Sequence, residues 1–335
     1  MRIATYNIEW FDALFDNAGQ VLADDDWSAR YNVTRRQQAE AIAIVLTALN
    51  ADAVMVIEAP DTSRRRSTSR ALSQFVEAYG LRTTGVVTGF VNDTQQEIAL
   101  LYDPAVMTAR HDPQGSPDSM PPRFDGAFDI DLDVDAALDH VTFSKPPLEL
   151  AVTLAGGRGL RMIGAHLKSK APHGAQGRDA VMRLSIANRR KQLAQAIWLR
   201  QRIAAHLEAG DDLIVMGDLN DGPGLDEYEN LFGRSSVEII LGDGGPRLFD
   251  PHAEQALVSR ISAQPTTARF YLTGEDRYLQ ALLDYVMISG GLRNLQPRWR
   301  IWHPFDDPVC WKTPELREAL LAASDHFPVS LDIDL

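Results

Sequence analysis

LIVMGDLND, residues 213–221, joins two kinds of sequence. Four apolar residues, typical of a buried strand, run into Gly217. Asp218, Asn220 and Asp221 then follow within four positions. The three polar residues allow two interpretations: an Asx turn before a Gly-Pro pair, or a functional site at the tip of a central strand. The ends of the other predicted strands bear on this choice.

The composition is that of a globular protein: 335 residues, 45% hydrophobic and 24% charged. The formal net charge of −13 argues against generic nucleic-acid binding, because affinity for phosphate backbones comes mainly from Lys and Arg. The charge still allows an enzyme with a local basic groove, or one that neutralises phosphate through bound cations. Cys310 is the only cysteine, which excludes an internal disulfide and a multi-cysteine zinc site.

The N-terminal sequence MRIATYNIEW is strand-like and lacks the apolar run of a signal peptide. No stretch reaches the roughly 18 to 20 apolar residues of a transmembrane segment. We therefore expect a cytoplasmic protein, or a secreted one if a leader has been removed. The sequence gives no reason to infer an obligate protein partner.

Hydrophobic periodicity predicts a mixture of helices and strands. Helices are predicted at 35–49, 70–79, 180–207 and 314–322. Strands are predicted at 2–8, 53–57, 85–91, 97–102, 148–154, 160–167, 212–216, 281–288 and 329–335. Residues 112–139, rich in Pro, Gly and Asp, predict a long loop insertion with a short helix near Ala136, and the region from the end of the 212–216 strand to about 265 has little pattern. The irregular order favours a mixed β-sheet core flanked by helices over a strictly parallel sheet.

Residues that bind metals or move protons occur at six of these strand ends. In chain order they are Asn7 and Glu9, Glu58, His166 and Lys168, Asp218 and Asn220, Asp284, and Asp325 and His326. Each also has a structural interpretation, such as a turn cap, a solvated strand end, a core histidine or an ion pair with arginine. Because ligand sites of α/β proteins gather at strand ends, the repeated pattern favours one shared site.

The chemistry of these side chains is consistent. Oxygen ligands such as Glu58, Asp325 and the amide of Asn7 suit Mg²⁺, Mn²⁺ or Ca²⁺ rather than zinc. Two histidines with nearby carboxylates can transfer protons near neutral pH. Lys168 can neutralise a phosphate oxygen. Together these residues predict metal-assisted attack of water on a phosphate ester.

The motifs N-x-E, V-I-E, H-L-K-S, G-D-L-N-D, L-D-Y-V and S-D-H-F-P occur in this order from Asn7 to His326. This series resembles the endonuclease/exonuclease/phosphatase superfamily of DNase I-like enzymes, and most closely its bacterial nuclease-like branch. F-S-K-P-P-L at 143–148 and A-L-L-Y-D-P at 99–104 resemble structural strands of that family. The resemblance implies an α/β (α+β) fold: a four-layer α/β sandwich of two packed mixed β-sheets flanked by helices, with residues 1–335 as one domain.

The resemblance also implies roles for the acidic and amide residues. Asn7, Glu58 and Asp325 resemble metal-site residues, with Glu58 as the central ligand, and Glu9 takes the place of a second acidic group. Asp218 and Asn220 resemble the residues that orient the attacking water and contact the scissile phosphate.

Two histidines are implied as catalytic residues. His326, held by Asp284, resembles the histidine beside the phosphate; we favour it as the stabiliser of charge, with Asp218 as the base. His166 stands where DNase I-like members have a second histidine and apurinic endonucleases have tyrosine, which disfavours abasic-site repair. A rough alignment suggests that Glu97 orients His166.

Three functional hypotheses follow. The first is a Mg²⁺-dependent phosphodiesterase of nuclease type, with nucleic acid as its expected substrate. The alternative is a hydrolase of small-molecule or lipid phosphoesters, a phosphomonoesterase or sphingomyelinase-like enzyme; the acidic charge favours it, but no exposed apolar hairpin is evident for membrane contact. A non-catalytic binding module is disfavoured because Asp218, Asn220, Asp284 and His326 are all present. Arg64 to Arg66 form either a phosphate-contacting loop or a solvated turn.

Overall fold

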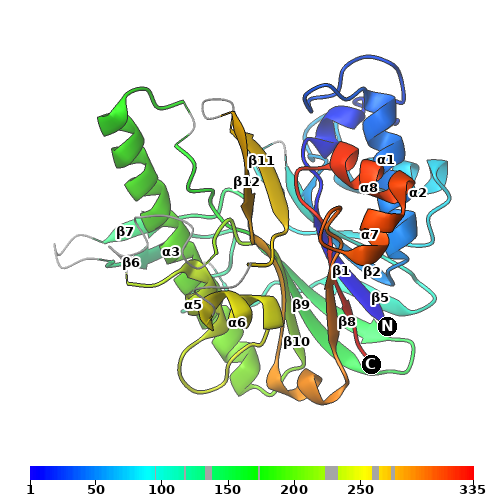
Figure 1. The fold of residues 1–335 in the computed structure, drawn as a ribbon. Helices are drawn as coiled ribbons and strands as arrows, with labels where there is room; N and C mark the ends of the chain where they lie inside the picture. Colours follow the sequence, from blue (N-terminus) through cyan, green and yellow to red (C-terminus); the bar gives the residue numbers. More distant parts are fainter. Residues whose placement is uncertain are drawn as a thin grey trace.

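The computed structural model describes residues 1–94, 96–116, 118–132, 138–172, 174–222, 233–258, 264–272 and 276–335. Its centre consists of two stacked β-sheets, and helices cover the outer face of each sheet (Figure 1). In the described part of the chain, no helix is both long and apolar enough to span a membrane.

The first sheet has six strands and brings the ends of β1 and β2 to one edge. Its strand order is β14 (Arg298–Ile301), β15 (Val329–Asp332), β1 (Arg2–Asn7), β2 (Ala53–Ala59), β4 (Glu97–Tyr102) and β3 (Gly85–Thr88). β1 and β2 are parallel and in register, with Asn7 opposite Ile57. Asn7 and Glu58 therefore leave the sheet at the same end.

The second sheet has five strands, in the order β13 (Asp284–Ile288), β10 (Leu213–Asp218), β9 (Gly159–His166), β8 (Leu148–Leu154) and β5 (Met107–His111). β9 and β10 are parallel, and Asp218 is opposite His166. On the other side β13 is antiparallel to β10, and Asp218 is opposite Asp284. Three candidate site residues thus lie side by side on neighbouring strands.

Alternation along the strands produces four layers. In β1 and β2, Ile3 and Met55 face the second sheet, whereas Ala4 and Val54 face the helices, because successive side chains of a strand point to opposite faces. The helices α1 (Arg35–Leu49), α2 (Thr68–Ala78) and α8 (Pro314–Ala323) cover the first sheet, and α3 (Arg178–Glu208), α5 (Ser236–Leu241) and α6 (Pro251–Val258) cover the second. The predicted four-layer α/β sandwich is confirmed.

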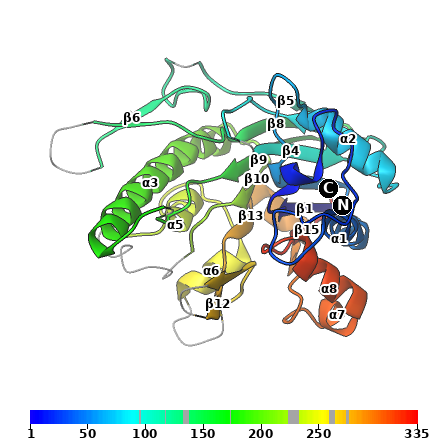
Figure 2. The same cartoon turned by 90° about the horizontal axis from the view of Figure 1, so that it is seen from above.

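Two hairpins extend from this sandwich. One pairs β6 (Phe128–Ile130), inside the predicted insertion, with β7 (Asp139–Val141) at its end. It lies beside α3 (Figure 2), where Phe128 stacks on Trp198 at 5.5 Å between ring centroids. The helix predicted near Ala136 lies outside the described residues. The other pairs β11 (Ala268–Leu272) with β12 (Arg277–Ala281).

Several elements differ from the predictions. The predicted strand 281–288 is split into the end of β12 and β13, and the strand predicted at 85–91 ends at Thr88. β5, β11, β14, the short helix α7 (Pro308–Lys312) and the 3-10 helices η1 (Phe11–Leu14) and η2 (Gly290–Asn294) were not predicted. The unpatterned region contains α5 and α6, whose six and eight residues are too few for a clear helical period.

Candidate active site

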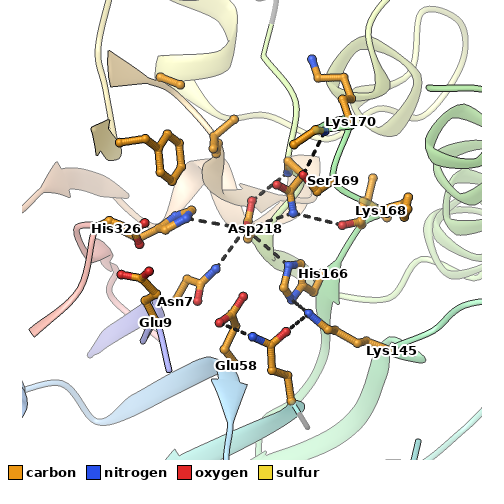
Figure 3. A pocket seen from close by; sticks show the side chains of 18 of the residues that line it. Asn7, Glu9, Glu58, Lys145, His166, Lys168, Ser169, Lys170, Asp218 and His326 are labelled. Carbon is orange, nitrogen blue, oxygen red and sulfur yellow. Dashed lines mark hydrogen bonds and ion pairs between the residues drawn. The ribbon is translucent and has the colours of Figure 1, made fainter. Parts of the chain in front are cut away.

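The predicted residues meet in a pocket at the shared edge of the two sheets (Figure 3). The cavity has a volume of about 980 Å³. The predicted residues that line it are Asn7, Glu9, Glu58, His166, Lys168, Asp218, Asn220, Asp325 and His326. Asp284 lies behind His326, and no described residue of the 112–139 insertion lines the pocket.

Asp218 is the centre of the site and is almost fully buried, with 1% exposure. Its Oδ2 accepts a hydrogen bond from Asn7 Nδ2 at 3.0 Å, which joins the two sheets. Asn220 donates twice, from its backbone N to Oδ1 at 2.7 Å and from Nδ2 to Oδ2 at 3.2 Å. The Nε2 atoms of His166 and His326 lie 3.6 and 3.9 Å from Oδ2. The Asp218 carboxylate therefore lies close to site residues from both β-sheets.

The backbone conformation on both sides of Asp218, within the segment LIVMGDLND, explains how its side chain reaches the centre of the site. Gly217 has φ 136°, and a Cβ at this position would lie 2.0 Å from the carbonyl oxygen of Ala165, so only glycine lets β10 approach β9 so closely. Asn220 adopts a left-handed conformation with φ 50°, which asparagine tolerates. Asp218 and Asn220 therefore converge through a turn.

Asp221 has a structural role. It is fully buried and pairs with Lys170 at 2.7 Å and with Arg189 at 2.8 Å. Its Oδ2 also accepts the backbone N–H of Ser236 at 2.6 Å, at the start of α5. The carboxylate thus fastens the loop after β10 to α3 and α5.

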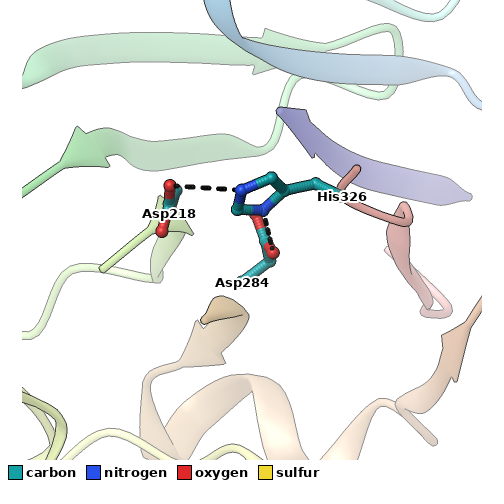
Figure 4. A group of neighbouring side chains, drawn as sticks. All are labelled: Asp218, Asp284 and His326. Atoms are coloured by element: carbon teal, nitrogen blue, oxygen red, sulfur yellow. Dashed lines mark hydrogen bonds and ion pairs between the residues drawn. The ribbon is translucent and has the colours of Figure 1, made fainter. Parts of the chain in front are cut away.

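His326 and Asp284 form a buried pair (Figure 4). His326 Nδ1 donates to Asp284 Oδ2 at 2.8 Å, so Nε2 faces Asp218. Burial lowers the pKa of His326, but the carboxylates of Asp284 and Asp218 outweigh burial and raise it well above its ordinary value. Asp218, Asp284 and His326 offer three ligand-type atoms within 4.8 Å of one another. Because both nitrogens of His326 face carboxylates, this arrangement suits holding a proton better than holding a cation.

The loop that carries Asp325 and His326 is tied to β1 by Ser324. Its hydroxyl donates to the carbonyl of Asn7 at 2.8 Å and accepts the backbone N–H groups of His326 at 3.1 Å and Glu9 at 3.2 Å. The predicted N-x-E and S-D-H motifs, more than 300 residues apart, are therefore positioned by one buried side chain.

His166 lies on the other side of Asp218 in an opposite environment. Its Nδ1 is 3.2 Å from the Nζ of Lys145. Burial, together with the positive charges of Lys145 and His326, lowers the pKa of His166 well below its ordinary value. Burial raises the pKa of Asp218 to about 7, against the opposing effect of His326. The site therefore combines a neutral histidine, a protonated histidine and a carboxylate that titrates near neutral pH.

Glu58 stands at a β-bulge that turns its carboxylate toward the pocket. The register of β2 against β4 shifts between Ile57 and Ala59, and Glu58 has a left-handed φ of 62°. Such strain in a non-glycine residue is typical of functional sites. Burial raises the pKa of Glu58, and Asp325 adds to this effect.

Oxygen atoms of Asn7 and Glu9 lie near Glu58 and form, together with it, a set of oxygen ligands for a metal ion (Figure 3). Asn7 Oδ1 is buried, and no described residue donates a hydrogen bond to it, because Nδ2 of the same amide is turned to Asp218. Burial and Asp325 raise the pKa of Glu9 to about 7, although Glu9 forms an ion pair with Arg30. A buried amide oxygen to which no described residue donates, beside half-buried carboxylates, is what an oxygen-coordinated divalent cation requires, so these residues fit the predicted metal.

The profile of the endonuclease/exonuclease/phosphatase family matches residues 4–326, which include every predicted site residue. The chain belongs to this family. At family level its activity is therefore hydrolysis of phosphoesters, and members generally depend on a divalent metal.

Solved structures agree with this family in their fold. The chain is similar to truncated TDP2 of Caenorhabditis elegans, with 13% identity and a TM-score of 0.50 over 100% of this chain and 97% of that chain. It is also similar to D. rerio TDP2 complexed with a single-strand DNA product, with 12% identity and a TM-score of 0.50 over 99% and 97%. At such low identity these likenesses support the DNase I-like fold alone. No curated protein matches the chain.

Lys145 and Gln96 are among the polar residues of the pocket that were not predicted. Lys145 lies in the FSKPPL segment, which we had interpreted only as a structural strand of the family. Gln96 directly precedes β4, and its side chain bridges Lys145 and Glu58. The suggestion that Glu97 orients His166 is wrong, because Glu97 accepts a hydrogen bond from Asn92 at 2.7 Å and lies near the backbone of Thr62. A single Lys or Gln forms no sequence motif, but the place of Gln96 directly before a strand was a usable signal.

The arginine-rich turn after Glu58 is partly structural. Arg66 pairs with Asp61 at 3.0 Å and Asp12 at 3.8 Å, and it donates to the carbonyl of Phe15. Arg64 and Arg65 are exposed. Arg66 therefore fixes the loop, whereas Arg64 and Arg65 are free to contact solvent or a ligand.

One wall of the pocket is apolar, which the sequence did not predict. Phe270, Leu272 and Leu279 from the β11–β12 hairpin line the cavity, and the Phe270 ring packs edge-on against His326 at 5.5 Å between centroids. On the other face of the hairpin, Tyr271 and Tyr278 are about half exposed. The sequence offered no clear candidate for an exposed apolar hairpin, and the exposed side chains of this hairpin were not recognised there.

Proposed function

We propose that this chain is a divalent-metal-dependent phosphodiesterase of nuclease type, which hydrolyses P–O bonds of DNA or RNA. The observation that carries the proposal is the arrangement around Asp218: a buried carboxylate between two histidines, one in contact with Lys145 and the other with Asp284, next to a set of oxygen ligands. A group that titrates near pH 7 is suited to general acid–base catalysis at neutral pH.

Asn7, Glu58 and Asp325 would hold the cation, for which Mg²⁺ is the first candidate and Mn²⁺ or Ca²⁺ the alternatives. When bound, the cation neutralises charge on the phosphate oxygens and polarises the phosphorus–oxygen bond. Glu9 is assigned a supporting place, because its ion pair with Arg30 already compensates its charge. The side-chain amide of Asn7 joins the two parts of the site, since its oxygen would bind the cation and its nitrogen donates to Asp218.

The protein side chains have separate roles in an in-line displacement at phosphorus. Asp218, with Asn220, orients a water molecule and accepts its proton as the water oxygen forms a bond to phosphorus and the leaving oxygen departs. Protonated His326, held by Asp284, stabilises the negative charge that develops on phosphate. His166 and Lys168 bind the remaining phosphate oxygens from the opposite side.

The β11–β12 hairpin supports a second candidate, a hydrolase of small-molecule or lipid phosphoesters. A cavity of about 980 Å³ is larger than a phosphate group needs, and its apolar wall can receive an acyl chain as well as a nucleobase. The net charge of −13 also favours a substrate with one phosphate over a polyanion. Lys168, on the opposite wall, favours nucleic acid, because its ammonium group can contact a phosphate of the chain.

A substrate panel separates the candidates. The purified protein is incubated with plasmid DNA, RNA, bis-p-nitrophenyl phosphate, p-nitrophenyl phosphate and sphingomyelin vesicles, with Mg²⁺ or EDTA. The proposal expects cleavage of nucleic acid and of the diester, with loss of both in EDTA. Hydrolysis of the monoester alone would establish a phosphatase, and hydrolysis of vesicles alone would establish the lipid candidate; either result would overturn the nuclease assignment.

A further inference from the structure

The two histidines that flank Asp218 have opposite partners. His326 Nδ1 is 2.8 Å from the carboxylate of Asp284, which can only accept a hydrogen bond. His166 Nδ1 is 3.2 Å from the ammonium group of Lys145, which can only donate. Both imidazoles direct Nε2 toward Asp218 Oδ2. The partner atoms therefore determine which nitrogen atoms of each imidazole ring are protonated.

For His166, the contact with Lys145 is compatible with only one tautomer of the imidazole ring. Because Lys145 donates to Nδ1, that nitrogen must be the unprotonated one, and the ring proton resides on Nε2. The N–H of Nε2 then faces Asp218 Oδ2 at 3.6 Å, in the region where phosphate would bind. The opposite tautomer would place an N–H group against the ammonium group of Lys145 and a lone pair against the carboxylate of Asp218.

Lys145 is itself held in place. It lies in the segment between β7 and β8, and its Nζ donates to Gln96 Oε1. The same amide donates from Nε2 to Glu58 Oε2 at 2.5 Å. Since the lysine offers only donors and the carboxylate only acceptors, the Gln96 amide satisfies both in a single orientation. A continuous series of contacts thus runs from Glu58 through Gln96 and Lys145 to His166.

We propose that Lys145 is a positioning residue that fixes His166 as the Nε2–H tautomer, so that this nitrogen donates a hydrogen bond into the catalytic pocket. His166 then acts as a fixed donor to a phosphate oxygen beside Asp218, and His326 is the histidine that carries the extra proton. The role in catalysis rests on the proposed phosphodiesterase function, whereas the tautomer is a property of the protein without substrate.

The tautomer can be measured directly by NMR on protein labelled with ¹⁵N-histidine, without metal or substrate. The His166 resonances are assigned with His166→Gln. The wild type is expected to show only the Nε2–H form of His166, and Lys145→Met is expected to populate the Nδ1–H form. Lys145→Arg, which also supplies only donors, is expected to keep the wild-type form. If His166 remains entirely Nε2–H in Lys145→Met, or is Nδ1–H in the wild type, the proposal is overturned.

Steady-state kinetics on bis-p-nitrophenyl phosphate with Mg²⁺ provide the second readout. Lys145→Met is expected to lower kcat about tenfold with KM little changed, because one oriented donor is lost; Lys145→Arg should restore most of kcat. Lys312→Met is the control, since it removes the same charge from an exposed position on α7. A rise in KM with unchanged kcat would mean that Lys145 only binds substrate, and would overturn the positioning role. If the wild type hydrolyses none of the substrates, the phosphodiesterase proposal fails while the NMR test of Lys145 still applies.

Discussion

Replacement of Asp284 by Asn removes the carboxylate that holds His326 without changing the shape of the side chain. The two groups are 2.8 Å apart, and the residues are only 2% and 6% exposed. A hydrogen bond to a charged group contributes about 1.5 to 3 kcal/mol. If all of this is realised in the transition state, kcat falls about 10- to 150-fold, since about 1.4 kcal/mol corresponds to a factor of ten.

The same substitution changes the pH dependence in a defined direction. Asp284 is a main cause of the raised pKa of His326, so its charge keeps the imidazole protonated to higher pH. Without that charge the pKa of His326 falls, and the protonated form is lost at lower pH. Asp284→Asn should therefore lose more activity at pH 8 than at pH 6.

The assay is the kcat of Mg²⁺-dependent diester hydrolysis between pH 6 and 9, with circular dichroism and thermal unfolding to confirm folding. Asp250→Asn is the matched control, because Asp250 is also fully buried and accepts a hydrogen bond from Val286 on β13. This control should leave the pH profile unchanged. An equal loss at every pH for Asp284→Asn, or no loss at all, would refute the assigned role of His326.

Three further predictions test other parts of the site. Mg²⁺ at one hundred times its Kd should stabilise the protein by about 2.7 kcal/mol, which is measured as a higher Tm than in EDTA. Asn7→Ala should remove most of this rise in Tm. A wild-type Tm that is the same with Mg²⁺ and with EDTA would contradict the metal site. Gly217→Ala should cost about 3 kcal/mol or more of unfolding free energy in urea, because its Cβ would lie 2.0 Å from the carbonyl oxygen of Ala165 at a φ of 136°; an unchanged midpoint would show that the strands can separate. Lys168→Met should raise KM about tenfold with kcat nearly constant, since it removes one contact to a bound phosphate; an unchanged KM would remove Lys168 from the substrate site.

The location of the site could be predicted because strand geometry leaves little freedom. β1 and β2 are parallel neighbours, as are β9 and β10, so the polar residues that follow them leave at one edge. The order of the motifs then gave the family and with it the four-layer sandwich. The identity of residues 1–335 as one domain and the roles of the individual site residues remain predictions.

Side-chain partners could not be predicted in the same way. His166 and His326 look equivalent in the sequence, and only the fold shows that one contacts Lys145 and the other Asp284. The β11–β12 hairpin was missed because its exposed residues include aromatic and apolar side chains on both faces, which hides the strand alternation. The left-handed conformation of Asn220 depends on its contacts with Asp218, which a strand pattern does not encode.

The central claim is that His326 and a divalent cation act together on a phosphodiester. The most direct measurement is the rate of bis-p-nitrophenyl phosphate hydrolysis by the wild type and by His326→Gln, each with Mg²⁺ and with EDTA. We predict Mg²⁺-dependent hydrolysis by the wild type, its loss in EDTA and return on adding Mg²⁺, and a rate at least about 100-fold lower in His326→Gln. Hydrolysis that persists both in EDTA and in His326→Gln would contradict the account.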